Sequence, residues 1–294
     1  DHPGQKPQAD HGEVLDDGKQ LPDEPQHLKQ GKITVPQLEI LEIPYRILDG
    51  QVTDVNVLMS ELTRIACSRS GPVAIVVRKQ AFASFEQVAK SEEIGSLTRE
   101  EAITQVVDSL PDDVAVVCTT GMASRELFEI RKVSNRGHHR DFLTVGGMGH
   151  AGQIAAGIAL ARPDRFFVCI DGDGAALMNL GGNAIIADCS NLVHIVINNG
   201  AYDSVGGQPT KGWVVDFTKI AKACGYGRFS SAITRDQIRS SVISMIGCGN
   251  SSLLEVKCKR GSRADLGRPE RTPRQNKKDF VKFLRLSKQV NAGN

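Results

Sequence analysis

The sequence predicts an α/β protein whose main part is a doubly wound, mostly parallel sheet, preceded by a partial second α/β domain. Two observations carry this prediction. From residue 113 onward, continuous apolar runs of five or six residues recur between helical patterns, as expected of strands covered on both faces. Between residues 28 and 82 the alternation supplies only two strands, which are marginal as an isolated sheet.

The N-terminal third of the chain divides by composition. Residues 1–27 are rich in Asp, Gln, Gly and Pro and lack hydrophobic periodicity, so we expect a loop or disorder there. Order is expected from near residue 33. Within residues 28–82 we expect helix, strand, helix and strand, in the segments ITVPQLEILEI, IPYRIL, VNVLMSELTRIACSRSG and PVAIVVR. The polar residues 83–98 form the expected linker.

Residues 99–285 form the predicted main domain, and residues 286–294 a tail. Thr98 and Glu101 have the spacing of a capping box and open the first helix. The expected strands are residues 114–118, 142–146, 166–170, 192–197 and 253–257. Helical patterns between them include MASRELFEI, GHAGQIAAGIALA and DFTKIAKAC. In such sheets ligands bind at the carboxyl ends of the strands, near the point where the strand order reverses.

Charge and cysteine content narrow the function classes. The chain has 36 basic and 34 acidic residues, which gives no general reason to expect a nucleic acid or an acidic membrane surface as partner. The basic residues concentrate in segment 257–278, which is either a solvated stretch or a ligand-binding one. Seven cysteines without a CxxC motif disfavour a zinc site and a disulfide framework.

Location follows from what the sequence does not contain. It has neither an apolar stretch long enough to span a bilayer nor a signal peptide, so we expect a cytoplasmic protein with no membrane partner. The chain begins with Asp1 in a polar stretch, so we expect that it starts within a longer protein.

The strongest chemical signal is the segment IDGDGAALMNLGGNAIIADCSNLVHIVINNGAY, residues 170–202. One buried strand runs into Gly172, Asp173 and Gly174. A short alanine-rich helix follows, and a second buried strand runs into Asn198 and Asn199. Because parallel strands end at the same edge of a sheet, Asp173 and Asn199 are expected to converge there.

This pattern fits a diphosphate bound through a divalent cation. Magnesium prefers oxygen ligands, which the Asp173 carboxylate, the Asn199 side-chain carbonyl and the Ala201 backbone carbonyl can supply. Gly172 and Gly174 let the backbone approach a phosphate closely, and the following helix offers its N-terminal amides. Each fragment alone is more simply a tight turn or a polar loop, but their combination at this spacing favours the diphosphate site.

The GDG and NN pattern resembles the binding motif of the thiamine diphosphate (ThDP) decarboxylases. The segments DFLTVGGMGHAGQIAAGIALARPDR, IDGDGAALMNLGG, NLVHIVINNGAYDSVGGQPT and KRGSRADLGRP narrow the resemblance to phosphonopyruvate decarboxylases, with sulfopyruvate decarboxylases as close relatives. The resemblance covers roughly residues 24–285. It implies a ThDP-binding fold, the cofactors ThDP and Mg2+, and decarboxylation of 3-phosphonopyruvate to phosphonoacetaldehyde and CO2 in phosphonate biosynthesis.

The resemblance also assigns roles to individual residues. Magnesium ligands are Asp173, Asn199 and the carbonyl of Ala201. Met148 supports the bent conformation of the cofactor and Gly146 accepts from its aminopyrimidine, although a methionine in this position is often simply core packing. The remaining positions matched to cofactor contacts are Thr119, Thr120, Gly121, Gly147, Gly172, Gly174 and Ala175. The Thr119 to Gly121 turn is alternatively a helix cap.

The loop after the metal motif is the expected substrate site. Its hydroxyl, amide and backbone N–H groups suit a phosphonate or a sulfonate, although an ordinary polar loop has the same composition; the residues are Ser204, Gly206, Gly207 and Gln208. His150 is either a polar wall of the active site or a helix-terminal residue. Members of the family usually carry histidine where this chain has Tyr202, so the resemblance assigns no acid–base role to that position.

One expected group was not found in the chain. These enzymes activate the cofactor with a glutamate early in the pyrimidine-binding domain, whereas residues 28–82 resemble only the C-terminal half of that domain. Glu39 and Glu42 are most simply surface or cap residues. We therefore expect a fragment of a longer chain or a subunit completed by a pyrimidine-domain partner, in addition to homo-oligomerisation.

Three alternatives to phosphonopyruvate decarboxylation remain. One is sulfopyruvate decarboxylation, and another is a non-catalytic ThDP-binding fragment or subunit. A nicotinamide-binding domain is disfavoured because no GxGxxG motif opens a helix after a strand.

Overall fold

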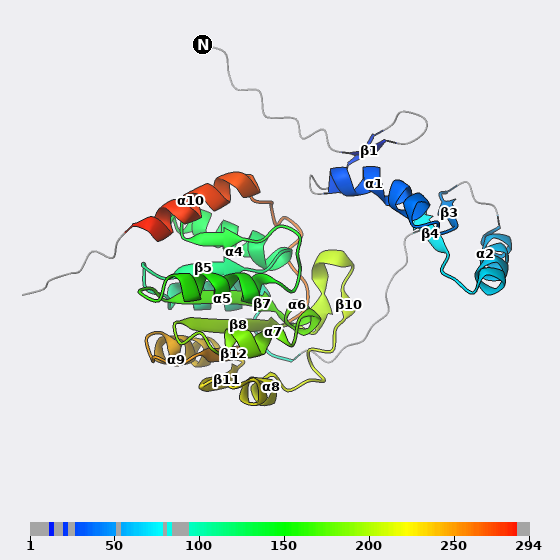
Figure 1. Cartoon of the computed structure of the whole chain (residues 1–294). Coiled ribbons are helices and arrows are strands. Elements are labelled where there is room, and N and C mark those ends of the chain that lie inside the picture. Colours follow the sequence, from blue (N-terminus) through cyan, green and yellow to red (C-terminus); the bar gives the residue numbers. More distant parts are fainter. Residues whose placement is uncertain are drawn as a thin grey trace, which may run out of the picture. The chain divides into compact units, whose positions relative to one another are not determined.

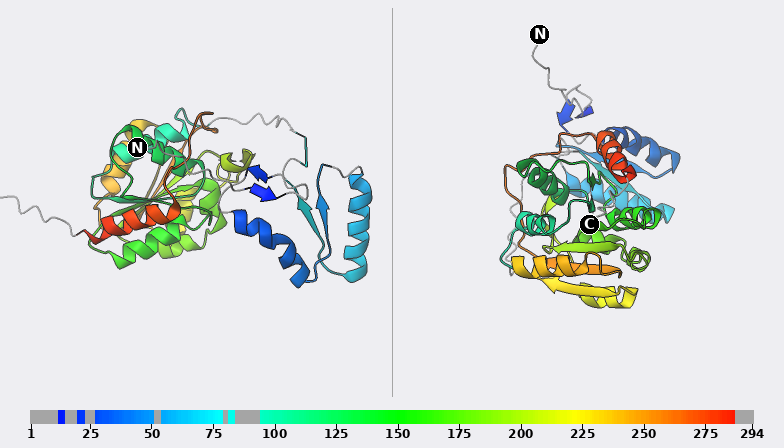
Figure 2. Two further views of the ribbon diagram at one scale, coloured as in Figure 1. Left: turned by 90° about the horizontal axis from the view of Figure 1, so that it is seen from above. Right: turned by 90° about the vertical axis from the view of Figure 1, so that its left-hand side faces the viewer.

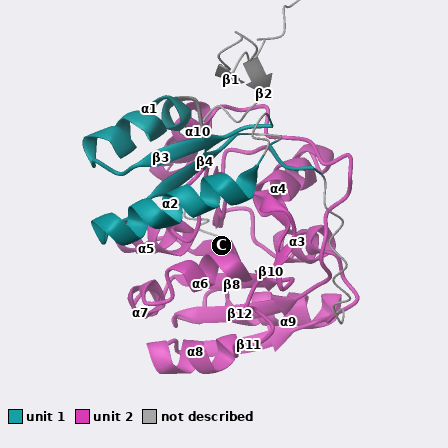
Figure 3. Ribbon diagram, turned by 90° about the vertical axis from the view of Figure 1, so that its right-hand side faces the viewer, with its two compact units in different colours: residues 1–90 teal, residues 91–294 magenta. Residues whose placement is uncertain are grey.

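The computed structural model describes residues 12–14, 20–22, 27–50, 54–78, 81–83 and 94–286. The chain divides into two compact units, residues 1–90 and 91–294 (Figure 3). Residues 84–93, most of the predicted linker, lie outside the described part, as do residues 287–294 of the predicted tail.

Unit 1 contains the helix, strand, helix and strand predicted from its sequence. They are α1 (His27–Ile40), β3 (Tyr45–Leu48), α2 (Val55–Arg69) and β4 (Ala74–Val77), and the two strands pair in parallel. Helix α1 begins before residue 33, in the mostly polar segment 27–32, which adds no hydrophobic period that would mark the start of the helix. Asp54 caps α2 by accepting from the backbone N–H groups of Asn56 and Val57.

The first 27 residues contain more structure than expected. Two short strands, β1 (Gly12–Val14) and β2 (Gln20–Pro22), pair antiparallel, so the prediction of only loop or disorder is wrong at these positions. Strands of three residues are too short to produce a readable alternation of apolar and polar side chains.

Large apolar side chains of unit 1 are exposed. Ile40 is 81% exposed, Val57 is 64% exposed and Val77 is 48% exposed. A two-stranded sheet with two helices has too little surface to cover these groups. Unit 1 therefore has apolar surface available for another polypeptide segment.

Unit 2 is built on a six-stranded parallel sheet (Figure 1). Its strands, in spatial order, are β11 (Arg228–Ala232), β12 (Ser252–Lys257), β8 (Leu192–Asn198), β7 (Phe167–Gly172), β5 (Ala115–Cys118) and β6 (Asp141–Leu143). The predicted doubly wound α/β fold is confirmed. Strand β11 was not predicted because its sequence, RFSSA, is not an apolar run, as befits a strand at the edge of the sheet.

Helices cover both faces of this sheet (Figure 2). One face packs against α3 (Arg99–Asp108), α4 (Met122–Val133) and α9 (Arg235–Met245). The other packs against α5 (Ala151–Ala161), α7 (Gly182–Ile186), α8 (Phe217–Cys224) and α10 (Pro273–Arg285). Helix α10 occupies the end of the basic segment, where Phe280 and Phe283 are buried among mostly charged residues.

The connections place a topological switch point between β5 and β7. Helix α4 leads from β5 to β6 on one side, and α5 returns the chain to β7 on the other side of β5. Four short elements follow β7 and β8: α6 (Asp173–Met178), β9 (Ala201–Tyr202), the 3₁₀ turn η1 (Asp203–Val205) and β10 (Gln208–Pro209). The predicted site residues concentrate in these elements and the adjoining turns.

The burial of two cysteines agrees with the sequence-based expectation. The seven cysteines are free, and Cys118 and Cys169 are fully buried as expected of small hydrophobic residues. None of the helices in the described part of the chain combines the length and apolarity needed to cross a bilayer.

Candidate active site

Asp173 and Asn199 meet at the carboxyl edge of the sheet, as their positions in the sequence predict. Gly172 at the end of β7 pairs in register with Ile197 of β8. The backbone N–H of Asn199 donates to the Asp173 carboxylate, and both residues are buried. The Asp173 carboxylate thus contacts the backbone at the start of the asparagine loop.

The Asp173 carboxylate has close neighbours that the sequence did not identify. Thr210 donates its hydroxyl to Asp173 Oδ2. The backbone of Gly212 approaches so closely that a Cβ added there would lie 2.2 Å from the same oxygen. Burial raises the pKa of Asp173 to about 6, although the hydrogen bonds from Thr210 and Asn199 oppose the shift. The ionised carboxylate is therefore poorly solvated and is suited to a bound cation.

The two asparagines have different partners. Asn198 donates its amide to the carbonyl of Gly212 at 2.8 Å and to Glu255 Oε1 at 2.7 Å, so it holds the loop against β12. Asn199 donates its amide to Asp203 Oδ2 at 2.6 Å, and its Oδ1 accepts from the backbone N–H of Ala201 at 3.2 Å. Oδ1 retains a lone pair for a further ligand.

The glycine-rich turn before α5 offers open backbone. Gly146 and Gly147 have φ angles of 68° and 56°, and among the described residues no atom lies within 4 Å of a Cβ added at either position. Gly149, by contrast, packs against α6, with its ideal Cβ position 3.1 Å from the carbonyl oxygen of Ala175. Met148, between them, is half-buried. The turn is thus anchored at Gly149 and open at its start.

His150 is the residue that precedes the first turn of α5. It is exposed, and its Nδ1 lies 3.2 Å from the carbonyl oxygen of Gly147 and 3.3 Å from that of Met148. The structure therefore bears out the helix-terminal interpretation of His150. A contact with substrate remains a prediction.

The turn after β5 contacts the predicted substrate loop. A Cβ added to Gly121, whose φ is 96°, would lie 3.1 Å from Cβ and Oγ of Ser204. Thr119 is buried, and within the described part of the chain its Oγ1 has no hydrogen-bond partner. The turn does cap α4, as the alternative predicts, because Gly121 is its N-cap; neither threonine supplies a side-chain cap bond in the described structure.

The loop after Asn199 folds back over the GDG turn. Tyr202 pairs with Gln208 in the short β9–β10 ladder, and its ring covers Gly174, where a Cβ would lie 2.3 Å from Cε1. Gly206 and Gly207, with φ angles of 120° and 74°, form the turn between these strands. Ser204, Gly206 and Gln208 are exposed and remain free to contact a ligand.

Much of the basic C-terminal segment is occupied by ion pairs. Arg263 contacts Glu100, Glu129 and Asp265. Arg260 lies nearer the site: its guanidinium donates to the carbonyl of Gly200 at 3.2 Å and stacks over Trp213, 4.5 Å from the ring centroid. The segment therefore contributes structural contacts around the asparagine loop.

A second group of possible ligand atoms lies deeper in the sheet. Ligand atoms of Cys169, Asp171 and His194 lie within 4.8 Å of one another, and all three residues are buried. Burial raises the pKa of the Cys169 thiol well above its usual value, so the thiol stays protonated. Since magnesium prefers oxygen ligands, Asp173 and Asn199 form the better magnesium site.

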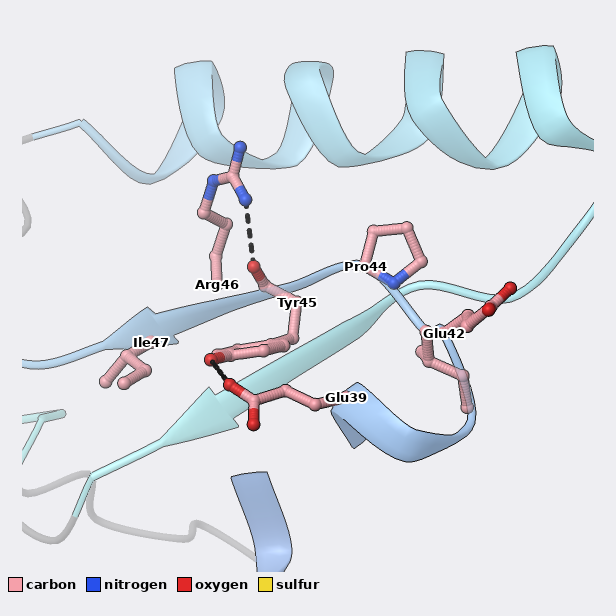
Figure 4. A pocket seen from close by; sticks show the side chains of 7 residues that line it. Glu39, Glu42, Pro44, Tyr45, Arg46 and Ile47 are labelled. Carbon is pink, nitrogen blue, oxygen red and sulfur yellow. Dashed lines mark hydrogen bonds between the residues drawn. The ribbon is translucent and has the colours of Figure 1, made fainter. Parts of the chain in front are cut away.

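Unit 1 presents Glu39 and Glu42 beside an open pocket of roughly 680 Å³ (Figure 4). Glu39 Oε1 accepts from the Tyr45 hydroxyl at 3.1 Å, which raises the pKa of Tyr45. Glu42 follows α1 with a φ of 54°, as in a helix-terminating residue. These surroundings agree with the prediction that both glutamates are surface or cap residues.

Comparison with known proteins gives one family match and several relatives. The C-terminal TPP binding domain of thiamine pyrophosphate enzymes matches residues 118–256. That range contains every position from Thr119 to Gln208 discussed above.

Three of the relatives are decarboxylases or subunits of one. The chain is 30% identical over 279 residues to a phosphonopyruvate decarboxylase of Streptomyces viridochromogenes, covering 89% of this chain and 69% of that protein. It is 32% identical over 282 residues to a phosphonopyruvate decarboxylase of Streptomyces hygroscopicus, with coverage of 89% and 68%. The beta subunit of sulfopyruvate decarboxylase from Methanothermobacter thermautotrophicus is 37% identical over 145 residues, with coverage of 48% and 75%.

Proposed function

The chain belongs to the phosphonopyruvate decarboxylase family of thiamine pyrophosphate enzymes, and from this membership we propose that it decarboxylates 3-phosphonopyruvate with ThDP and Mg2+. The products are phosphonoacetaldehyde and CO2. The observation that carries the proposal is the pairing of Asp173 and Asn199 at the switch-point edge of a sheet that matches the TPP-binding family.

The residues at this edge fit a diphosphate with its metal. Asp173, Asn199 and the carbonyl of Ala201 form an all-oxygen donor set of the kind magnesium prefers. Gly172 gives the backbone room, because among the described residues no atom lies within 4 Å of an added Cβ. Gly174 and Ala175 lie in the first turn of α6, where backbone N–H groups attract a phosphate.

The rings of the cofactor would lie against two neighbouring turns, one before α5 and one after β5. Gly146 and Gly147 are open, and Thr119 offers a buried hydroxyl that lacks a hydrogen-bond partner in the described structure. We assign Met148 to support of the cofactor ring and Gly146 to its aminopyrimidine. When bound, ThDP supplies the electron sink for loss of the carboxylate, while the chain contributes binding and orientation.

The substrate site is assigned to the loop residues Ser204, Gly206, Gly207 and Gln208. Ser204 adjoins Gly121 after β5, the Gln208 side chain lies against Gly206, and no described atom comes within 4 Å of a Cβ added at Gly207. Hydroxyl, amide and backbone N–H donors at this place suit a tetrahedral anion. A sulfonate offers the same three-oxygen face, and the sulfopyruvate decarboxylase relative makes sulfopyruvate the second candidate substrate.

A partner polypeptide is also part of the proposal. The exposed apolar residues of unit 1 need a partner surface, and the described residues contain no convincing candidate for the activating glutamate. We propose that another chain, either a second copy or a separate pyrimidine-domain subunit, supplies this surface and the glutamate.

Comparing CO2 release from phosphonopyruvate and sulfopyruvate tests the substrate assignment. The chain is assayed with ThDP and Mg2+, alone and together with a pyrimidine-domain partner. We expect kcat/KM to favour the phosphonate by at least about tenfold, since a dianion and a monoanion differ by a full charge in a site of fixed donors. Equal rates or a preference for the sulfonate would contradict this assignment.

The same assay separates catalysis from cofactor binding alone. We expect the partner to be required for turnover, because the described residues include no candidate for the activating glutamate. Rapid CO2 release by the chain alone would show that the glutamate lies within it after all.

A further inference from the structure

Asp203 lies where three parts of unit 2 meet. Its Oδ2 accepts from the Arg99 guanidinium at 2.6 Å, from Asn199 Nδ2 at 2.6 Å and from the backbone N–H of Gly261 at 3.0 Å. Arg99 begins α3, Asn199 follows β8, and Gly261 follows β12. One carboxylate oxygen thus connects the start of α3 and the segment after β12 to Asn199, a residue of the proposed metal site.

This contact, together with the 3.2 Å hydrogen bond from the Ala201 backbone N–H to Asn199 Oδ1, determines which way the Asn199 side chain faces. A carboxylate only accepts hydrogen bonds, so the amide nitrogen of Asn199 must face Asp203 and the carbonyl oxygen must face away. The opposite side-chain orientation would place two oxygens against each other and turn the NH2 group toward the metal position. Only the observed orientation presents an oxygen to a cation.

Arg99 in turn fixes Asp203. Its Nε and Nη2 donate to the two oxygens of Glu126 at 2.7 and 2.9 Å, while Nη1 donates to Asp203. The three side chains are almost fully buried, with exposures of 7% for Arg99, 1% for Glu126 and 9% for Asp203. A guanidinium held in this two-pronged pairing has little freedom, so its third contact is fixed in direction.

We propose that Asp203, held by Arg99, is a positioning residue that orients Asn199 for magnesium. This inference rests on the proposed function, because it requires Asn199 to be a metal ligand. It adds two residues that the motif does not contain and that do not touch the cation.

The network of Arg99, Glu126 and Asp203 also carries net charge. A substitution in it can therefore change the attraction for a cation as well as the orientation of Asn199. Two carboxylates share one guanidinium, so the network has one net negative charge near the proposed metal position. Removing a carboxylate weakens attraction of a cation, whereas removing Arg99 strengthens it. Orientation and charge therefore predict opposite outcomes for loss of the arginine.

The test is calorimetric titration of Mg2+ into the whole chain at saturating ThDP. Asp203→Ala removes the oxygen that accepts from Asn199 and is expected to weaken Mg2+ affinity by about 10–100-fold, the usual effect of losing a group that orients a metal ligand. Glu126→Gln removes the same charge from the same network without touching Asn199, and we expect a change within about threefold. Equal losses in the two variants would overturn the proposal.

Arg99→Met supplies the test with the opposite sign. If Arg99 acts by holding Asp203, Mg2+ affinity falls although the site becomes more negative; unchanged or tighter binding would overturn the proposal. Arg99→Lys replaces this test if the methionine variant fails to fold. Lysine retains the charge but lacks the two-pronged geometry, and we expect Mg2+ affinity to fall in this variant too. Arg131→Met, which breaks the equally buried Arg131–Asp141 pair at the start of β6, is expected to leave Mg2+ affinity unchanged.

Failure of this inference differs from failure of the proposed function. An unmodified chain that shows no magnesium-dependent ThDP binding would overturn both. An unmodified chain that binds, with Asp203→Ala and Arg99→Met variants that bind equally well, would overturn only the positioning role.

Discussion

Replacing Asp173 with asparagine is expected to lower the affinity for ThDP in the presence of Mg2+ by on the order of 100-fold or more. The substitution keeps the size of the side chain but removes the only charged member of the proposed donor set. Loss of a group that merely orients a ligand costs about 10–100-fold, so loss of the anionic ligand itself should cost more. Calorimetric titration of ThDP into both proteins at fixed Mg2+ measures the effect.

In contrast, Asp173→Asn is not expected to lower the free energy of unfolding of the ligand-free chain at pH 8. Burial raises the pKa of Asp173 from 3.8 to about 6, so the stability gained from the protonated carboxyl is fully present below pH 3.8 and is lost as pH rises through about 6. At pH 8, without ligands, ionised Asp173 costs up to about 3 kcal/mol. The ligand-free asparagine variant should therefore resist urea at pH 8 at least as well as the parent chain.

Bound Mg2+ is expected to stabilise the ionised form of Asp173 in the parent chain. Because the cation and the proton compete for Asp173, Mg2+ affinity should fall as pH decreases through about 6. An Asp173→Asn variant that retains magnesium-dependent binding of ThDP, or an affinity independent of pH between 5 and 8, would rule out Asp173 as the metal ligand.

Replacing Gly212 with alanine is the second substitution for which we expect a large effect. The new methyl group would lie 2.2 Å from Asp173 Oδ2 and 2.5 Å from Asn198 Oδ1, both on short, buried side chains. Neither can move without breaking its hydrogen bonds. We expect loss of stability of about 1–3 kcal/mol from overpacking, and at least a tenfold loss of Mg2+ affinity from displacement of the carboxylate.

A matched glycine substitution controls for the general effect of adding a methyl group. Gly157 lies on the exposed side of α5, where no described atom comes within 4 Å of an added Cβ. Alanine there should increase stability by up to about 1 kcal/mol, because it favours the helix, and should leave Mg2+ affinity unchanged. If Gly212→Ala binds Mg2+ as tightly as Gly157→Ala does, Gly212 does not restrain Asp173.

The central architecture was predictable because its strands are long apolar runs in a buried parallel sheet. The segments that became β5, β7, β8 and β12 have few polar residues, and their burial on both faces produces this pattern. The edge strand β11 and helix α10 lack such runs. Thr272 and Gln275 do form a capping box in α10, a signal that was present in the sequence but was not used.

The core of the site was predictable for a different reason. Asp173 and Asn199 each follow a buried strand directly, so local sequence and sheet topology together bring them to one edge. Thr210, Gly212 and Arg99 could not be identified in the same way. Their roles depend on contacts between distant residues, such as Arg99 with Asp203, that no periodic pattern or turn motif specifies.

Calorimetric titration of ThDP into the whole chain, with and without Mg2+, tests most directly the claim that unit 2 holds a diphosphate through a divalent cation. We predict binding that requires Mg2+ and disappears when a chelator is added. The absence of ThDP binding at any Mg2+ concentration, or binding of NAD in its place, would contradict the account.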